Sequence, residues 1–398
     1  MACHQVWPEV KGSQSPNPLM NHTRSLEHGA KALVAGLLML TSLFLTSCQR
    51  KQVYSGDWRQ LRRGEKDDRW GYVDNSGKWA IEPKFKWEAD FSEGIAAVLL
   101  PKKGKGYGYI DKTGAWVAKP QFSLAWNFSE GLAAVCDRKA KWGFIDMTGK
   151  YAISPQFEEA HYFSEGLAAV KIAGKWGYID KRGKFVIPPR FDASYNVQNG
   201  ESVFSGGVAV IRNDSPPSFE LIDRNGDVIK RLSGFLYRIH RFRDGLAWVE
   251  MPESERSGRK VFRFINRTGE FAFSQTFYGA GEFSEGLAVA FADGAYGYID
   301  TTGRFVIPPR FPIASGFSEG LAVVKLDTRD TRSCYIDKTG RIVIQPLGDG
   351  RAGPFKAGLA AVDLNSPGGY LAKGAQWGYI DKTGKVVCTF TRGRSAQW

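Results

Sequence analysis

"WGYIDKRGKFVIPPRF", from Trp176 to Phe191, holds two short apolar runs and the link that joins them. Asp180 can bond the following backbone N–H groups with its carboxylate, and Gly183 can adopt the positive φ angle that closes a turn. The link therefore predicts a β-hairpin. Proline cannot donate a ladder hydrogen bond, so Pro188 is expected to end the second strand.

The hairpin string recurs nine times, in steps of 34–44 residues. Within each copy, Trp and Tyr share one face of the strand while Gly and Ile share the other, so we expect burial on both sides. The Asp is interpreted as a turn cap, a position that Asn266 also fills. We interpret the following as structural repeat residues: Trp70, Trp142, Trp176, Trp377, Asp74, Asp111, Asp146, Asp180, Asp223, Asp300, Asp337 and Asp381.

A second string, of the type "FSEGLAAV", alternates with the first in eight copies. Its glutamate is interpreted as a solvated turn residue, because Gly206 and Ala357 stand in the same place and a ligand site would tolerate such changes poorly. The glutamates concerned are Glu93, Glu130, Glu165, Glu285 and Glu319.

The repeat predicts an all-β protein. One unit cannot bury its own apolar faces, so neighbouring units must stack. We expect a tandem array of about nine three-stranded antiparallel units. Propeller blades commonly have four strands and about 40–50 residues. The shorter units here therefore favour an open curved solenoid, with a closed propeller-like ring as the alternative. The repeat domain is expected at residues 70–390, after a linker or cap at 48–69 and before a basic tail at 391–398.

The N-terminal segment predicts export. The apolar run from Ala32 to Leu45 is too short to span a bilayer comfortably and fits a signal peptide. The residues that end at Cys48 resemble a bacterial lipobox, so residues 1–47 are expected to be a leader and Cys48 the lipidated first residue. An ordinary cleaved signal and a short uncleaved anchor are the alternatives. The weakly charged start suggests Met20 as the true initiator, although Met1 stays open.

The net charge of +13 bears on possible partners. Nucleic acid is the usual partner of a basic chain, but an exported protein does not meet it routinely. Anionic lipid headgroups, acidic polysaccharide and cell-wall polymer fit better, unless the lysines are only repeated turn residues with a diffuse charge. Membrane contact is expected through the lipid on Cys48, in the cell envelope, at the outer membrane or in the periplasm of a Gram-negative cell.

The sequence predicts no catalytic, cofactor-binding or metal-binding residues. Cys136, Cys334 and Cys388 lack CxxC or Cys/His spacing and are interpreted as apolar fillers. His161 and His240 are the histidines after Cys48 and are interpreted as surface or filler residues.

The alternation of the two strings resembles the WG-repeat (KWG-repeat) family of bacterial proteins over roughly residues 53–390. The resemblance brings no catalytic residues with it. We therefore expect an exported, lipid-anchored, non-enzymatic binding or scaffold protein with a protein or polysaccharide partner. The alternatives are a carbohydrate- or cell-wall-active enzyme with paired carboxylates and a structural spacer. Any functional mark is expected near the broken copies "FELIDRNG", "FRFINRTG" and "SCYIDKTG". The polar loops "NVQNGESV", "RNDSPPS" and "PESERSGRK" of the middle units are the expected place for a partner.

Overall fold

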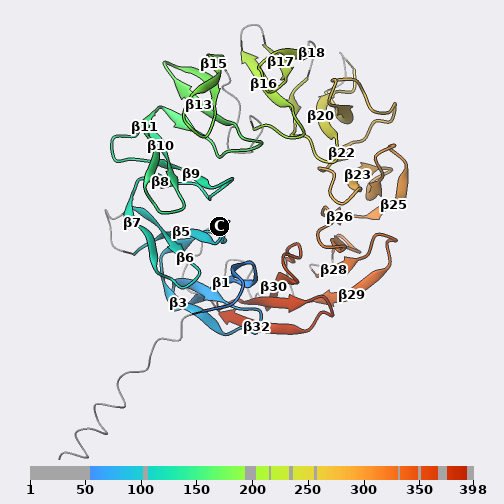
Figure 1. Ribbon diagram of the computed structural model, residues 1–398. Helices are drawn as coiled ribbons and strands as arrows, with labels where there is room; N and C mark the ends of the chain where they lie inside the picture. Colours follow the sequence, from blue (N-terminus) through green and yellow to red (C-terminus); the bar gives the residue numbers. More distant parts are fainter. Residues whose placement is uncertain are drawn as a thin grey trace, which may run out of the picture. The chain divides into compact units, whose positions relative to one another are not determined.

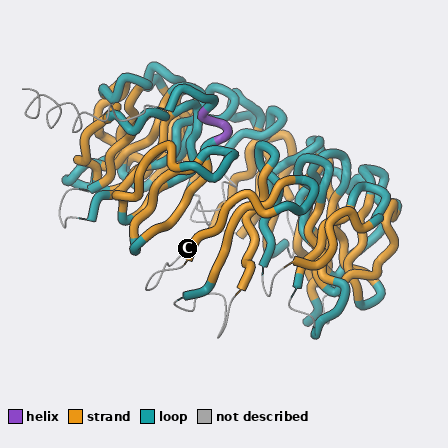
Figure 2. Tube along the Cα trace, turned by 90° about the horizontal axis from the view of Figure 1, so that it is seen from below, coloured by secondary structure: helices purple, strands orange, loops and turns teal. Residues whose placement is uncertain are grey.

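The computed structural model describes residues 54–101, 106–192, 203–214, 217–232, 236–254, 258–329, 332–347, 351–365 and 374–391. They belong to one compact unit that starts at Tyr54. The leader and Cys48 lie outside the described residues. Apart from one short 3₁₀-helix, η1 (Trp58–Gln60), the described part consists of strands, bends and turns (Figure 2).

The described strands form nine antiparallel sheets that follow one another around a ring (Figure 1). The ring is a β-propeller with nine blades, which we number along the chain. Blade 1 contains β1 (Arg62–Lys66), β2 (Arg69–Val73) and β3 (Trp79–Phe85), and blade 2 contains β4 (Trp87–Glu88), β5 (Ile95–Leu99), β6 (Tyr107–Asp111) and β7 (Trp116–Phe122). Blade 3 contains β8 (Leu124–Ala125), β9 (Leu132–Cys136), β10 (Trp142–Asp146) and β11 (Tyr151–Phe157). Blade 4 contains β12 (Glu159–Ala160), β13 (Ala168–Ile172), β14 (Lys175–Ile179) and β15 (Phe185–Phe191).

The second half of the ring holds blades 5 to 9. Blade 5 contains β16 (Ala209–Asp214), β17 (Pro217–Ile222) and β18 (Val228–Leu232), and blade 6 contains β19 (Arg238–Ile239), β20 (Leu246–Pro252) and β21 (Lys260–Asn266). Blade 7 contains β22 (Gly279–Ala280), β23 (Ala288–Ala292), β24 (Ala295–Ile299) and β25 (Phe305–Phe311), and blade 8 contains β26 (Ile313–Ala314), β27 (Ala322–Lys325), β28 (Ser333–Ile336) and β29 (Ile342–Leu347). Blade 9 contains β30 (Leu359–Asn365), β31 (Gln376–Asp381) and β32 (Val386–Thr391).

The expectation of three strands in every unit was wrong for five blades. In these blades a strand of two residues, such as β4, pairs with the "GLAAV" strand and completes a four-stranded sheet. Two residues are too few to leave a hydrophobic period in the sequence. The proline-containing strand, of the "FVIPPRF" type, is the last in each four-stranded sheet and lies at the outside of the ring (Figure 1).

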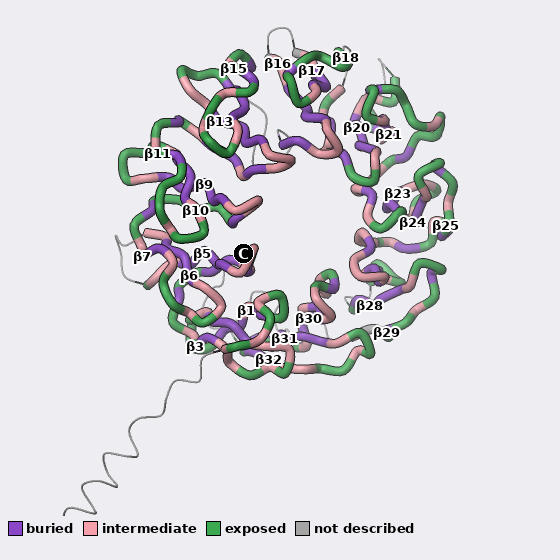
Figure 3. The backbone as a smooth tube through the Cα atoms, in the orientation of Figure 1, coloured by how far each residue is buried: buried purple, intermediate pink, exposed green. Residues whose placement is uncertain are grey.

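Each blade is buried on both faces by its neighbours (Figure 3). In β5, Ala96 and Val98 pack into an apolar cluster with blade 1, while Ile95 and Ala97 pack into another with blade 3. The same alternation gives an apolar cluster at every one of the nine contacts between consecutive blades. The small side chains of "LAAV" let these layers approach closely.

The preference for an open solenoid was wrong, because blade 9 packs against blade 1. Trp377 of blade 9 and Trp70 of blade 1 have ring centroids 6.2 Å apart and belong to one apolar cluster. Arg62 of blade 1 donates to the carbonyl oxygen of Ala357 before β30 at 3.1 Å. Closure buries the two end blades, which an open array would leave exposed on one face.

The glycine after each Trp explains the link between the "WG" and "IPP" strings. Trp176 pairs with Phe191 and Tyr178 pairs with Ile187, so Gly177 faces a bulge in the outer strand. A Cβ atom on Gly177 would lie 2.7 Å from the carbonyl oxygen of Ile187. The residue must be glycine because the outer strand crosses directly over its backbone.

One face of the ring, here the turn face, carries both the "DKTG" and the "FSEG" turns. Each repeat Asp, and Asn266, accepts the N–H groups of the residues two and four positions later, as Asp180 does from Arg182 and Lys184 at 2.9 Å. The glycine that ends each turn has a positive φ and lies against the outer strand of the preceding blade, except that Gly303 of blade 7 lies against Phe273 in the irregular segment of blade 6. Gly183, for example, lies against Ile153. Even Gly77 of blade 1 lies against Cys388 of blade 9.

The interpretation of the "FSEG" glutamates as merely solvated turn residues was wrong, because they bind the next blade; four of them are half-buried, and Glu285 is exposed but also accepts the Gly320 N–H. Glu93 of blade 2 accepts the backbone N–H groups of Glu130 and Gly131 of blade 3, at 2.7 and 2.9 Å. Ser92 Oγ donates to the carbonyl oxygen of Phe128 at 2.8 Å. The lysine of the "DKTG" turn completes the contact in three blades, as when Lys181 Nζ lies 3.3 Å from Glu130 Oε2. These residues clamp consecutive blades together.

We predict that Gly177→Ala destabilises the ring by about 1–3 kcal/mol, because the new methyl group overlaps the outer strand. Thermal unfolding of the two proteins measures the difference. Gly316→Ala is the matched control, because a Cβ there meets no atom within 4 Å and the φ of Gly316 is not positive. Equal stability of Gly177→Ala and the control would contradict the steric explanation.

We predict that Glu93→Ala costs about 1–3 kcal/mol of stability, because two partly buried N–H groups of blade 3 lose their acceptor. Chemical denaturation compares this variant with Glu82→Ala, which removes an exposed glutamate from β3. A Glu93→Ala variant as stable as the Glu82→Ala variant would show that the clamp contributes nothing.

Candidate functional site

The ring departs from its own pattern at blades 5 and 6. The position of Gly177 is taken by charged residues in these two blades, Glu220 in blade 5 and Arg263 in blade 6, and by the small buried Cys334 in blade 8. Glu220 is buried and lies 2.8 Å from Arg231 Nε. The guanidinium of Arg263 lies 3.5 Å from the ring centroid of Phe271. Charged side chains therefore fill space that the bulged outer strand occupies elsewhere.

The outer strands of these blades are also altered. In blade 5, Glu220 lies opposite Arg231 in continuous register, so β18 lacks the bulge that faces Gly177 in blade 4 and keeps only the register shift between Leu221 and Ile222. In blade 6, the segment after the turn makes only the isolated bridges of Ile265 with Phe271 and of Phe262 with Phe277, and no regular outer strand. The inner strands of the two blades still pack against each other, but blade 6 offers no regular outer strand to blade 5.

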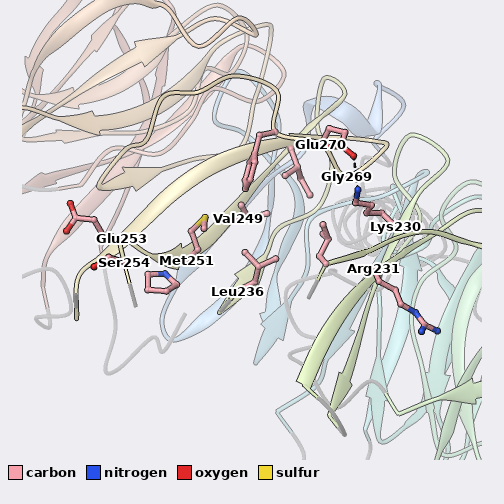
Figure 4. Close-up of a pocket in the computed structure, with 13 residues that line it drawn as sticks. Lys230, Arg231, Leu236, Val249, Met251, Glu253, Ser254, Gly269 and Glu270 are labelled. Atoms are coloured by element: carbon pink, nitrogen blue, oxygen red, sulfur yellow. Dashed lines mark hydrogen bonds and ion pairs between the residues drawn. The ribbon is translucent and has the colours of Figure 1, made fainter. Parts of the chain in front are cut away.

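A cleft of about 590 Å³ opens between blades 5 and 6 as a result (Figure 4). This volume lies within the range of small-molecule and side-chain binding pockets. The lining comprises Lys230, Arg231, Leu232, Leu236, Val249, Met251, Pro252, Glu253, Ser254, Ile265, Gly269, Glu270 and Phe271.

The cleft has an apolar wall and charged groups around it. Val249 and Ile265 are buried, and Phe271 is 45% exposed. Lys230 of blade 5 packs under Gly269, the turn glycine of blade 6, in the way that Ile187 of blade 4 packs under the turn glycine of blade 5. Lys230 Nζ lies 2.8 Å from Glu270 Oε1. An apolar group can enter beside this ion pair without separating it. A smaller cavity of about 390 Å³ lies between blades 7 and 8, beside Arg310 and Leu326.

The repeat residues named from the sequence lie away from the cleft. Trp176 and Trp377 are buried, and Trp70 and Trp142 are half-buried. The acidic residues are half-buried and cap turns. The hydroxyl of Thr383, together with the N–H groups of Thr383 and Lys385, holds the pKa of Asp381 below its ordinary value. None of them lines the cleft in the described residues.

Two of the three broken copies, "FELIDRNG" and "FRFINRTG", lie in blades 5 and 6, whereas "SCYIDKTG" lies in blade 8, away from the cleft. The sequence did not indicate the residues that line the cleft. Leu232, Leu236 and Met251 look like ordinary core residues in the sequence, because nothing there reveals that the neighbouring outer strand is absent. Of the polar loops, residues 193–202, 215–216 and 255–257 lie outside the described residues. Pro252, Glu253 and Ser254, which open the third loop, line the cleft.

The two histidines serve packing and an ion cluster. His161 is buried between Trp126 and Trp176, and burial lowers its pKa to about 4. His240 stacks on Trp248 with centroids 4.5 Å apart, and its Nδ1 lies 2.8 Å from Glu282 Oε1.

The carboxyl of Glu282 illustrates how strong this cluster is. Burial alone would raise its pKa, but His240 and Arg241 together hold it at about 2. Among the described residues, no group of three His, Cys, Asp or Glu side chains could hold a metal ion. Cys136, Cys334 and Cys388 are free thiols.

Two buried carboxyls lie between blades 1 and 2. Glu88 and Glu65 are both buried. Burial is the main cause that raises the pKa of Glu88 to about 9, against the opposing charge of Arg63 and with the help of Asp90 and Glu65. A carboxyl shielded from water in this way is poorly placed to protonate a polymer substrate.

We predict that Glu88→Gln stabilises the ring progressively between pH 4.5 and 9, because folding then no longer requires a protonated carboxyl. The folded pKa is raised, so Glu88 lowers stability as pH rises from its ordinary value of 4.5 toward about 9. Melting temperatures across this range should diverge upward for the variant and converge in acid. A difference that does not change with pH would contradict the assignment.

Within the part of the chain that the structure describes, no helix is both long enough and apolar enough to cross a membrane. That statement does not extend to residues 1–53, where the apolar run of the sequence lies.

The repeated sheets and their closure define a β-propeller built from a WG-type repeat. The sequence model described as "WG containing repeat" matches residues 70–103, 107–139, 142–176, 176–215, 262–294, 296–327, 335–366 and 377–390. The chain therefore belongs to the WG-repeat family. The matches leave out residues 216–261, which supply most of the lining of the cleft.

The similar solved structures are distant in sequence. A crystal structure of the eukaryotic initiation factor has a TM-score of 0.52 and 13% identity, over 76% of this chain and 85% of that chain. BamB from Moraxella catarrhalis has a TM-score of 0.39 and 12% sequence identity, over 77% of this chain and 94% of that chain. The WD40 β-propeller domain of Doa1 has a TM-score of 0.33 and 12% sequence identity, over 67% of this chain and 92% of that chain. No curated protein sequence matches the chain.

Proposed function

We propose that this propeller is a non-enzymatic binding or scaffold module of the bacterial cell envelope, and that the cleft between blades 5 and 6 receives a protein partner. The observation that carries the proposal is the coincidence of the cleft with the stretch that the WG-repeat matches leave out. Seven blades keep the repeat pattern largely intact and support the ring. The two that break it produce an open apolar surface.

The chemistry of the cleft favours a protein over a polysaccharide. Leu232, Leu236, Met251 and Phe271 offer aliphatic and aromatic contacts that suit apolar side chains. Polysaccharides need many hydrogen-bonding groups, and the charged groups at the cleft are engaged in part, as in the Lys230–Glu270 pair. The net charge of +13 adds a general attraction toward anionic envelope polymers.

The proposal includes export and a lipid anchor on Cys48. The apolar run from Ala32 to Leu45, followed by Leu45-Thr46-Ser47-Cys48, supports it. With Cys48 as the first mature residue, residues 48–53 would link the lipid to Tyr54, the first described residue of the propeller. The module would then act in the cell envelope, at the outer membrane or in the periplasm of a Gram-negative cell.

We predict that Cys48→Ala moves the protein from the membrane fraction to the soluble fraction and abolishes labelling by a fatty-acid analogue. Cys388→Ala, which changes a thiol in the last blade, should leave both unchanged.

The partner claim is checked by chemical crosslinking in intact cells that carry Phe271→Glu or the control Val306→Glu. Val306 is an outer-strand residue of blade 7 that is 48% exposed.

The adduct with the partner should disappear for Phe271→Glu and persist for Val306→Glu. Membrane fractionation unchanged by Cys48→Ala would remove the anchor from the proposal. An absence of any specific adduct with the unmodified chain would remove the binding function and favour a structural spacer.

A further inference from the structure

The outer edges of the blades differ in one respect that bears on the cleft. An exposed edge strand offers unpaired N–H and C=O groups to another chain, and proline on the edge blocks such pairing. Most outer strands carry this block. The prolines are Pro83 in β3, Pro120 in β7, Pro155 in β11, Pro188 and Pro189 in β15, Pro308 and Pro309 in β25, and Pro346 in β29.

Two of the outer strands in the described residues, β18 and β32, lack proline. β32 is the last strand of blade 9, and Phe390 on it packs at the contact with blade 1. β18 is the last strand of blade 5, and three of its residues, Lys230, Arg231 and Leu232, line the cleft. The unblocked edge and the cleft are therefore adjacent.

The backbone of β18 is oriented for pairing outward. Asp223 donates its N–H to the carbonyl oxygen of Asp227 at 2.9 Å, so Asp223 faces β18. Alternate residues of a strand direct their backbone groups to opposite sides, so Leu221 also faces β18 and Glu220 faces β16. Arg231 lies opposite Glu220. The backbone N–H and C=O groups of Arg231 consequently point away from β17, beyond the edge of the sheet.

The space beside this edge is open on the side of blade 6. A strand that paired with β18 would direct every second side chain toward blade 6, where the regular outer strand is absent and the cleft opens. Phe271 and Met251 would receive these side chains. The Arg231 side chain is 74% exposed, while its Nε is engaged by Glu220, so the rest of its guanidinium can meet a carboxylate.

We propose that β18 accepts an extended segment of a partner protein as an additional strand, with apolar side chains at alternate positions in the cleft and an acidic residue at Arg231. This inference rests on the proposed function, since it names how the partner is held. Main-chain hydrogen bonds would supply affinity, and the cleft would supply specificity for the apolar residues.

The first experiment uses a displayed library of random short peptides, selected on the full mature chain. Selected peptides should show alternating apolar residues and an acidic residue, and should protect the Arg231 amide from hydrogen exchange. Arg231→Pro should weaken their binding by at least about tenfold. Arg231→Ala is the matched control, because it loses the same side chain but keeps the N–H, and should weaken binding less.

The proline variant reproduces a natural arrangement, because Pro188 follows Ile187 in blade 4 as Arg231 follows Lys230 in blade 5. Both variants unpair Glu220 equally, so thermal unfolding should show similar stability. No selected peptide, protection elsewhere on the ring, or equal binding to the proline and alanine variants would overturn the inference. If the proline variant alone unfolds, exchange protection at β18 in the unmodified chain decides.

A second experiment separates this inference from the proposed function. A photoreactive amino acid is placed in cells at Ile229 in β18 or at Val306, which holds the same register in β25 of blade 7. The inference expects an adduct from Ile229 and none from Val306. Adducts of the unmodified chain with a chemical crosslinker, but none from Ile229, would leave the binding function standing and reject the edge of β18. No adduct by either method would reject both.

Discussion

Burial of each blade on both faces is the constraint on which the rest of the molecule depends. A strand such as β5 sends alternate side chains to two different neighbours, so it has no solvent face of its own. Such a blade is stable only between two others. The condition holds for the terminal blades as well, and the contact of Trp70 with Trp377 meets it by closing the ring.

The turn face makes these contacts specific as well as favourable. The apolar clusters alone could slide, because similar Ala, Val and Ile side chains recur in all of them. The carboxylate of Glu93 fixes the position of the next turn through two directional bonds, and Gly183 allows the turn to lie flat against Ile153. Where the acidic residue is replaced by Gly206, Arg267 lies in the vacated space instead.

The sequence predicted the local structure well and the relations between blades poorly. The turn chemistry of Asp180 and Gly183 is contained in a few neighbouring residues, so it can be recognised without the fold. The partner of Glu93 lies 37 residues further along, and no spacing rule for turns reveals such a bond. The two-residue strands leave no pattern, which made the units seem too short for a ring. The cleft could be placed only as a region, because it results from a strand that is missing.

Every blade of this ring is one continuous stretch of chain. Blade 1 runs through β1 to β3 and blade 9 through β30 to β32, so neither end lends a strand to the other. The seam between them is held by side-chain packing, as at the other contacts, and by Arg62, while Ala357 stands where other blades carry the clamping glutamate. The molecule thus has no obligatory starting point: a permuted gene that joined the present ends and began at another blade would recreate all nine contacts. Duplication or loss of a whole unit would likewise leave no blade incomplete, and would change only the curvature that each contact must accommodate.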